Sequence, residues 1–341
     1  MAESSRQKKA PKHEMWQLQQ MQSVPLEMKI KMTQTRIRDW YENWGGNVYV
    51  SFSGGKDSTV LLHIARELYP DIPAVFVDTG LEYPEIRKFV KTFENVEICY
   101  PEKTFFEVVA EYGYPVISKE VAKIIYYARK RSDWAIKRLY GFNADGSASK
   151  FKKRFKKYKF LMDAPFAISS YCCDVMKKAP AHKYEKETRR KPLIATMTEE
   201  SQQRQDAWLK NGCNAFDVDR PVSHPLSFWV QQDILQYLKT FNIPYCSVYG
   251  DIVELDSQLN LFEADCGRLI TTGCERTGCM FCMFGIMSDK TPNRFQRLKE
   301  THSPIYNYCV GGGEYDEKGL LKPNKQGLGI GKILDYIGVD Y

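Results

Sequence analysis

Five cysteines have the spacing of ligands in a metal centre. Cys274, Cys279 and Cys282 follow the pattern C-x4-C-x2-C, and the adjacent pair Cys172 and Cys173 offers two more thiols. Three thiolates this close need one further sulfur to hold an iron–sulfur cluster or a zinc ion. Five thiols compete for four positions. One of Cys172 or Cys274 is therefore expected to lie beside the ligands, to be redox-active or to be merely buried.

A glycine-rich turn that could bind phosphate lies between an apolar, β-branched run and a helical pattern. Its residues are Ser53, Gly54, Gly55, Lys56, Asp57 and Ser58. Glycines let an anion approach the backbone closely, and the start of a helix offers free N–H donors and a partial positive charge. Neither G-x-x-x-x-G-K-[ST] nor G-x-G-x-x-G fits these residues. The turn predicts a phosphate or pyrophosphate site of another kind.

The elements that must position these groups alternate between strand and helix. Buried-strand patterns at 47–52, 73–77, 96–100 and 192–196 are separated by helical spacing of apolar residues. This alternation predicts an α/β fold, an open, mostly parallel twisted sheet with helices on both faces. We expect a tail and amphipathic helix at 1–44, a nucleotide-binding domain at 45–253 with a basic helical insertion at about 115–170, and a small cysteine-rich C-terminal module at 254–341.

Charge and hydropathy limit the class of protein. The 341 residues carry 49 Lys and Arg against 42 Asp and Glu. Seven of those cations lie between Lys150 and Lys159, where Phe151, Phe155 and Tyr158 are interleaved. Such a run suits a phosphate backbone with aromatic faces for bases, or else a solvated helix face. Because no apolar run reaches membrane-spanning length and the first residues are polar, we expect a cytoplasmic protein with no membrane contact. The sequence carries no signature of an oligomeric state.

Several segments resemble one enzyme family. The turn at 53–58 resembles the pyrophosphate loop of the adenine nucleotide alpha-hydrolase superfamily, also called PP-loop ATP pyrophosphatases. Four further segments resemble its phosphoadenosine phosphosulfate (PAPS) reductase branch. They are DTGLEYP at 78–84, CCDVMKKAP at 172–180, ESQQR at 200–204 and the stretch from Pro225 to Tyr249. The resemblance covers about residues 45–285, and the usual glycine and arginine upstream of ESQQR are replaced here by Ala195 and by Met197 or Thr198.

The resemblance implies an adenine-nucleotide site with Mg²⁺, where the nucleotide is ATP, PAPS or adenylylsulfate (APS). The contacts it predicts, besides the turn, are Asp78, Thr79, Gly80 and Ser201. Lys56, Asp57, Lys177 and Arg204 are the predicted catalytic residues, three of them as cations that bind phosphate. In iron–sulfur members of the family, tandem cysteines and a later C-x-x-C bind a [4Fe-4S] cluster beside the nucleotide, which corresponds here to Cys172, Cys173, Cys279 and Cys282. An iron–sulfur cluster is thus favoured over zinc or no metal.

The resemblance also fails at one place. Sulfonucleotide reductases carry a thiol in a mobile C-terminal segment, whereas this chain ends without a cysteine after Cys309. The favoured hypothesis is therefore an ATP-using sulfur transferase that releases pyrophosphate and acts on tRNA or DNA, with a protein that donates sulfur or electrons as partner. The alternatives are a PAPS or APS reductase that releases sulfite, and a non-catalytic nucleotide- and cluster-binding module.

Overall fold

The computed structural model describes residues 12–150, 152–255 and 267–341. These residues form two compact units that interleave along the chain. The sheet unit comprises the described parts of Met1–Val77, Tyr83–Cys99 and Ala181–Thr277. The cysteine unit comprises those of Asp78–Glu82, Tyr100–Pro180 and Gly278–Tyr341. The consecutive division expected at residues 45 and 254 stays a prediction about independently folding domains.

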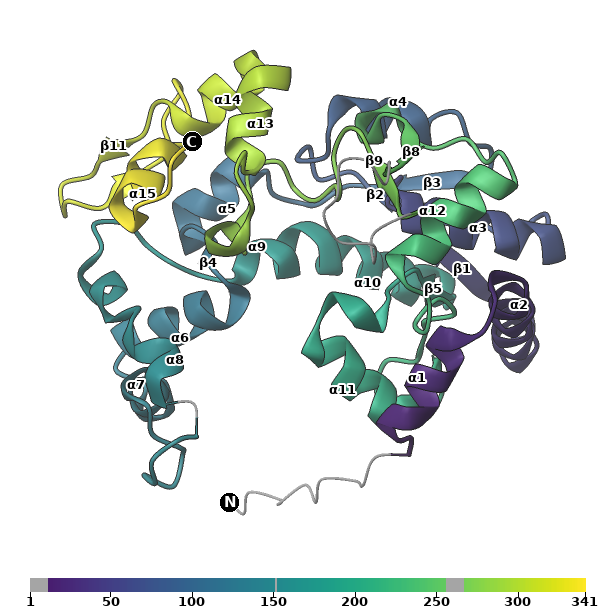
Figure 1. Cartoon of the computed structure of the whole chain (residues 1–341). Coiled ribbons are helices and arrows are strands. Elements are labelled where there is room, and N and C mark those ends of the chain that lie inside the picture. Colours follow the sequence, from purple (N-terminus) through teal and green to yellow (C-terminus); the bar gives the residue numbers. More distant parts are fainter. Residues whose placement is uncertain (1–11, 151, 256–266) are drawn as a thin grey trace. The chain divides into compact units, whose positions relative to one another are not determined.

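The sheet unit is built on six strands in the order β3-β2-β1-β5-β7-β6. The strands are β1 (Val48–Ser51), β2 (Ala74–Val77), β3 (Val96–Cys99), β5 (Lys191–Ile194), β6 (Asn214–Ala215) and β7 (Val222–Ser223). All neighbours run parallel except the pair β6 and β7. The order reverses direction between β1 and β5, and in open parallel sheets ligands bind at such a switch point, beyond the carboxyl ends of the strands. The expected α/β class is confirmed, and Figure 1 shows the sheet with its helices.

Helices cover this sheet because right-handed crossovers place the connections before and after a switch point on opposite faces. On one face, Tyr184 of α10 packs edge-on against Tyr49 of β1, with ring centroids 5.0 Å apart. The helices of the unit are α1 (Met15–Ser23), α2 (Leu26–Asn43), α3 (Lys56–Leu68), α4 (Pro84–Val90), α10 (Ala179–Thr188), α11 (Gln202–Asn211) and α12 (Gln231–Thr240). Short 3-10 turns η3 (Thr198–Glu200) and η4 (Ser247–Tyr249) and a hairpin of β8 (Ile252–Glu254) and β9 (Leu269–Thr271) complete it.

The helix expected at 26–44 forms as α2 and ends at Gly45 and Gly46, whose φ angles of +53° and +80° suit residues without a Cβ. Helix α1 is not predicted from the sequence, which places residues 1 to about 14 in a tail. Most of the predicted tail, residues 1–11, lies outside the described residues. Within those that are described, no helix is both long and apolar enough to span a bilayer.

The cysteine unit is mainly helical. Its helices are α5 (Phe105–Tyr112), α6 (Lys119–Arg129), α7 (Asp133–Tyr140), α8 (Lys152–Lys156), α9 (Tyr171–Cys173), α13 (Arg294–Thr301), α14 (Ser303–Val310) and α15 (Ile330–Ile337). Shorter turns are η1 (Lys159–Asp163), the π-helical η2 (Asp174–Lys178) and η7 (Ile286–Ser288). Strand β4 (Val116–Ile117) pairs in parallel with β10 (Met283–Phe284), which joins segments far apart in sequence, and β11 (Glu314–Tyr315) pairs with β12 (Leu321–Lys322).

Candidate functional site

The glycine turn lies where the sequence predicts it, between the end of β1 and the start of α3. Gly54 has φ +70°, and a Cβ built there would lie 2.7 Å from Val90 Cγ2 and 2.9 Å from Ile86 Cγ2. Only glycine fits this position without strain, because both the backbone angle and the side chains of α4 exclude a Cβ. The backbone of the turn is therefore held close to α4 and ahead of the first amides of α3.

Hydroxyl groups hold the turn in place. Ser58 Oγ donates to the Gly55 carbonyl at 2.9 Å, and Ser53 Oγ lies 3.0 Å from Ser58 Oγ. From a distant part of the chain, the Tyr249 hydroxyl accepts a bond from the Lys56 amide at 3.2 Å and lies 2.6 Å from Thr277 Oγ1. Neither Tyr249 nor Thr277 is predicted from the sequence as a member of the site, because no local pattern marks residues so far along the chain as neighbours of the turn.

Two charged side chains begin helix α3. The buried Lys56 donates from Nζ to the Glu275 carbonyl at 3.1 Å and lies 3.6 Å from Asp57 Oδ1. Asp57 Oδ1 is buried and has no hydrogen-bond partner among the described residues. A buried carboxylate oxygen that has an ion pair but no hydrogen bond leaves room for a further cation or donor.

We expect Gly54→Ala to lower the free energy of unfolding by about 2 to 4 kcal/mol, as the sum of a left-handed backbone angle and a steric clash. Urea unfolding measures this change. The matched control is Gly45→Ala, which also has positive φ but has open space where its Cβ would lie, so it should lose only about 1 kcal/mol. Equal losses in the two variants would contradict the steric role of α4.

The segment after β5 carries two more predicted residues. Ser201 caps helix α11, and its hydroxyl accepts a bond from the Arg204 amide at 3.4 Å. The Arg204 side chain forms an ion pair with Glu200, and Glu200 also pairs with Arg276 at 3.4 Å. Burial and the nearby cation Arg276 lower the pKa of the Arg204 guanidinium. The carboxylate of Asp57 acts in the opposite direction but does not outweigh them.

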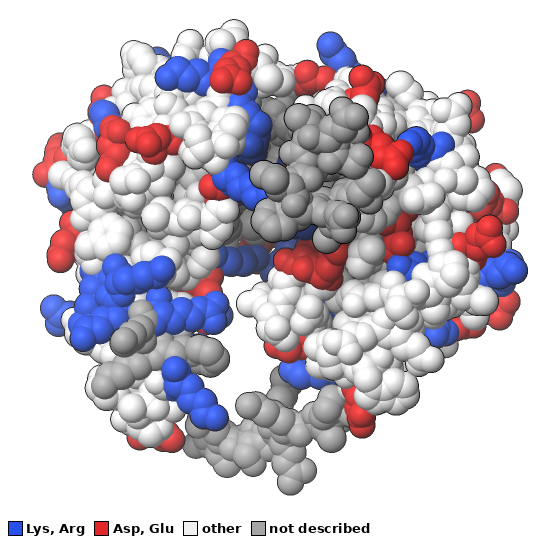
Figure 2. All heavy atoms as spheres, in the orientation of Figure 1, with Lys and Arg blue, Asp and Glu red and all other residues white. Residues whose placement is uncertain are grey.

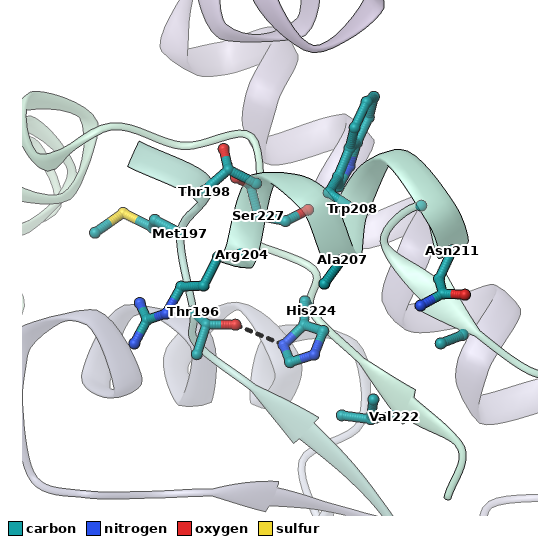
Figure 3. Close-up of a pocket in the computed structure, with 12 residues that line it drawn as sticks. Thr196, Met197, Thr198, Arg204, Ala207, Trp208, Asn211, Val222, His224 and Ser227 are labelled. Atoms are coloured by element: carbon teal, nitrogen blue, oxygen red, sulfur yellow. Dashed lines mark hydrogen bonds between the residues drawn. The ribbon is translucent and has the colours of Figure 1, made fainter. Parts of the chain in front are cut away.

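Arg204 also lines a cavity of about 280 Å³ between α11, the segment 196–198 that follows β5, and the strands β6 and β7 (Figure 3). His224 points into it and lies 2.5 Å from Thr196 Oγ1. Burial lowers the pKa of His224 to about 4, with smaller effects of the cations Arg204 and Arg220 in the same direction. The cavity wall is therefore neutral at this position near pH 7.

This low pKa predicts a pH dependence of stability. The unfolded chain binds a proton at His224 near its ordinary pKa of 6.5, whereas the folded chain does so only near pH 4. The contribution of the neutral His224 to the free energy of unfolding is complete above pH 6.5. It is lost as the pH falls, by about 2 kcal/mol between pH 7 and 4.5. Urea unfolding of the wild type and of His224→Asn at both pH values isolates this contribution. An equal loss of unfolding free energy between pH 7 and 4.5 in the two proteins would contradict the prediction.

In the cysteine unit, the predicted nucleotide contacts Asp78, Thr79 and Gly80 form a tight turn. Asp78 Oδ1 accepts a bond from the Gly80 amide at 3.0 Å, and Glu82 accepts one from the Thr79 amide at 2.9 Å. Glu82, which is not among the predicted site residues, also lies 3.8 Å from Lys177 Nζ. The turn and Lys177 are thus connected within one unit by a carboxylate.

Four of the five clustered cysteines line one small pocket of the cysteine unit, with a volume of about 20 Å³. They are Cys172, Cys173, Cys279 and Cys282, and the other walls are Leu81, Phe105, Pro115, Met176 and Lys177. Cys172 and Cys173 end helix α9 and are followed by the π-helical turn η2, an uncommon element that is frequent at functional sites. The fifth cysteine, Cys274, belongs to the sheet unit.

The thiols influence one another. Cys172 Sγ lies 4.0 Å from Cys173 Sγ, and this hydrogen bond lowers the pKa of Cys173 while it raises that of Cys172. Partial burial disfavours the charge of Lys177, but Cys279 and Glu82 outweigh it and raise the pKa of this ammonium group. Among the described residues, no three His, Cys, Asp or Glu side chains converge closely enough to hold one metal ion.

The basic run at 150–159 lies in the cysteine unit on α8 and η1, apart from Phe151, which is outside the described residues. The expectation that Phe155 offers a face to a base is wrong, because its side chain is 2% exposed and lies under Arg138 and Arg154. Tyr158 is half-buried, with Lys157 Nζ 4.9 Å from the centre of its ring.

An α/β protein with a glycine turn at the switch point of its sheet is the class that the fold and the turn define. The family model described as the phosphoadenosine phosphosulfate reductase domain matches residues 47–117 and 119–284. The chain therefore belongs to this family, as the sequence resemblance implies. The match includes the glycine turn and all five clustered cysteines.

Three curated relatives illustrate the range of the family. An uncharacterized protein of Methanocaldococcus jannaschii is 24% identical over 296 residues, which cover 84% of this chain and 54% of that protein. A phosphoadenosine 5'-phosphosulfate reductase of Alkalilimnicola ehrlichii is 22% identical over 235 residues, which cover 66% of this chain and 74% of that protein. Subunit 2 of a Salmonella arizonae sulfate adenylyltransferase is 25% identical over 233 residues, which cover 64% of this chain and 67% of that protein. The chain spans about half the length of the first of these relatives.

Proposed function

We propose that this protein uses ATP to activate an acceptor and then transfers sulfur to it. In the first step an acceptor oxygen attacks the α-phosphate of ATP, and the bond to the β-phosphate breaks, so that pyrophosphate leaves. In the second step a sulfide ion that the donor protein has already released attacks the activated carbon, and AMP leaves with the acceptor oxygen bound to its phosphate. The observation that carries the proposal is the pocket shared by four cysteine thiols, in a chain that also holds the glycine turn at 53–58.

The glycine turn supports the first step. The free amides at the start of α3 and the Lys56 ammonium group supply donors and positive charge for the pyrophosphate that leaves. Lys56 is already held by the Glu275 carbonyl, so it needs little reorganisation when a phosphate arrives. Lys177 and Arg204 remain our candidates for further phosphate contacts. Arg204 can make such a contact only by leaving Glu200.

Asp57 fits a role beside Mg²⁺, which proteins bind through one or two carboxylates together with substrate phosphates. Its buried Oδ1, which has no hydrogen-bond donor within the described chain, is the kind of oxygen that such an ion takes. Mg²⁺ would supply charge compensation for the phosphate oxygens. Ser53, Ser58, Asp78, Thr79, Gly80 and Ser201 complete the nucleotide contacts that we propose.

We propose a [4Fe-4S] cluster rather than zinc at the four thiols, because adjacent cysteines followed by a later C-x-x-C resemble the cluster ligands of the family. A tetrahedral zinc ion needs sulfurs only about 3.8 Å apart, since each Zn–S bond is about 2.3 Å. In a cluster each thiolate binds a different iron, so the sulfurs lie further from one another. The four thiols share one pocket, and the 4.0 Å between Cys172 Sγ and Cys173 Sγ is close to the zinc spacing, so analysis of iron and zinc separates the two metals. The bound cluster would supply a site for sulfide or for electrons, and Cys274 would not be a ligand.

A reductase that releases sulfite is the second candidate, because the Alkalilimnicola ehrlichii relative bears that name. Such a reaction needs a thiol that can reach the substrate. Cys309 is 0% exposed inside the packing of α14, and burial raises its pKa, so it does not meet this requirement. A binding module without turnover is the third candidate.

The experiment that separates these candidates starts with anaerobic purification and analysis of iron, sulfide and zinc. The same sample is then assayed for pyrophosphate release from ATP and for sulfite release from PAPS and APS. About four irons per chain with pyrophosphate release supports the sulfur transferase. Sulfite release overturns it in favour of the reductase, and nucleotide binding without either product overturns it in favour of the binding module.

A further inference from the structure

The positive charge of the chain is concentrated in one segment of the cysteine unit. Residues 119–160 contain 14 Lys and Arg but only three Asp and Glu, which leaves 35 cations and 39 acids elsewhere. Figure 2 shows Lys and Arg gathered over the helices α6 to α8. Lys119 and Lys123 are one helical turn apart on α6, and Lys130 is the residue that follows the end of this helix.

The acids of this segment do not cancel the charge. Glu120 pairs with Arg138 at 3.4 Å and with Arg154 at 3.1 Å, which orients these two guanidinium groups. Asp133 pairs with Lys137 at 2.9 Å. Further exposed cations of the same segment are Lys123, Lys130, Arg131, Lys156 and Lys157. A surface this positive attracts a polyanion over a distance of about one Debye length, roughly 8 to 10 Å in physiological salt.

Large aromatic side chains are exposed among these cations. Trp134 and Tyr140 on α7 are 42% and 48% exposed, and Phe142 and Phe160 are 40% and 43% exposed. Lys159 Nζ lies 3.4 Å from the centre of the Tyr140 ring, which joins α7 to η1. Tyr127 of α6 packs beside Trp134, with ring centroids 5.5 Å apart. We call the four exposed aromatic residues and the cations around them the aromatic-basic surface.

Exposed rings among cations fit unpaired nucleotides better than a duplex. In a duplex the faces of the bases are stacked inside, so a ring on a protein surface meets only the backbone and groove edges. In a single strand or a loop the base faces are free to stack on aromatic side chains while Lys and Arg contact the phosphates. A solvated helix face would explain the lysines but not the four exposed rings.

We propose that the aromatic-basic surface binds a single-stranded or looped nucleic acid and stacks its bases on Trp134 and Tyr140. In the proposed function, the strand bound here would be the acceptor of sulfur, and only this part of the inference rests on that function. Binding itself requires neither ATP nor the cluster. The sequence run at 150–159 thus supplies charge, and the stacking residues come mainly from α7, outside that run.

The test is equilibrium binding of a fluorescent single-stranded RNA of mixed sequence to the full chain without ATP. We expect Trp134→Ala and Tyr140→Ala each to raise Kd roughly 5- to 150-fold, as loss of one stacked base does. Trp134→Phe should restore most of the affinity because a ring remains. Replacing Lys156 and Lys157 by Ala should lower the slope of log Kd against log salt by about 0.7 for each phosphate that the variant no longer neutralises.

Three controls make the outcome decisive. Tyr315→Ala removes another exposed tyrosine that also lies beside a lysine, with Lys332 Nζ 5.3 Å from its ring, and should leave Kd unchanged. Heparin, which has charge but no bases, should bind equally to the wild type and to Trp134→Ala. A duplex of the same length should bind more weakly than the single strand.

The proposal is overturned if the duplex binds as well as the single strand, or if the aromatic variants keep wild-type affinity while the lysine variant loses it. In both cases the surface is an unspecific electrostatic one. Pyrophosphate release by the same preparations is measured separately. Strand binding without pyrophosphate release would refute the proposed function and leave this surface intact, and the reverse result would refute the surface alone.

Discussion

Cys279→Ser is expected to reduce the iron content of the anaerobically purified protein from about four atoms per chain to less than one. The serine hydroxyl is a poor ligand for iron, and Cys279 faces the same small pocket as Cys172, Cys173 and Cys282. Sulfur transfer should fall to background with the loss of the cluster. Iron and sulfide analysis together with the visible absorption spectrum measures the change.

Cys274→Ser is the matched control because it removes a thiol from the same C-x4-C-x2-C pattern. Cys274 lies in the sheet unit, where its amide donates to the Val248 carbonyl at 2.9 Å, while the other two cysteines of the pattern lie in the cysteine unit. We expect this variant to keep full iron content. Iron lost from Cys274→Ser and retained in Cys172→Ser would place Cys274 in the ligand set instead, and one zinc per chain would refute the cluster.

Lys56→Met is expected to slow pyrophosphate release from ATP by about 10² to 10³-fold, the usual effect of removing one charge-stabilising donor from an active site. Methionine keeps most of the apolar stem of the buried lysine but lacks its ammonium group. The loss should appear in kcat, because the donor acts on charge that develops as pyrophosphate leaves. Initial rates at saturating ATP measure it.

Lys29→Met is the control for burial. Lys29 is as buried as Lys56, but its Nζ lies 2.6 Å from Asp233 and has no part in the glycine turn. Loss of this buried ion pair should destabilise the fold by about 3 kcal/mol, yet pyrophosphate release per folded molecule should stay unchanged. If both variants lose activity in proportion to their stability, Lys56 is structural and the proposed phosphate contact is wrong.

Local patterns in the sequence determined much of the fold. The expected strands at 47–52, 73–77 and 96–100 form as β1, β2 and β3 within one or two residues, and the helix at 26–44 forms as α2. Hydrophobic periodicity, glycine caps and the glycine turn act over a few residues, so they can be recognised without knowing what packs against them. The same holds for family membership, because its motifs are short segments in a given order.

Only the tertiary structure decided which distant residues meet. It assigns Cys274 to a different unit from the four thiols that share a pocket, brings Tyr249 and Thr277 to the glycine turn, and buries Phe155 while it exposes Trp134. Spacing shows that a side chain is near others in sequence, but its neighbours and its exposure depend on how complete elements pack. The chemistry of this protein was therefore visible in its residue types, whereas the membership of each site was set by contacts across nearly 200 residues of chain.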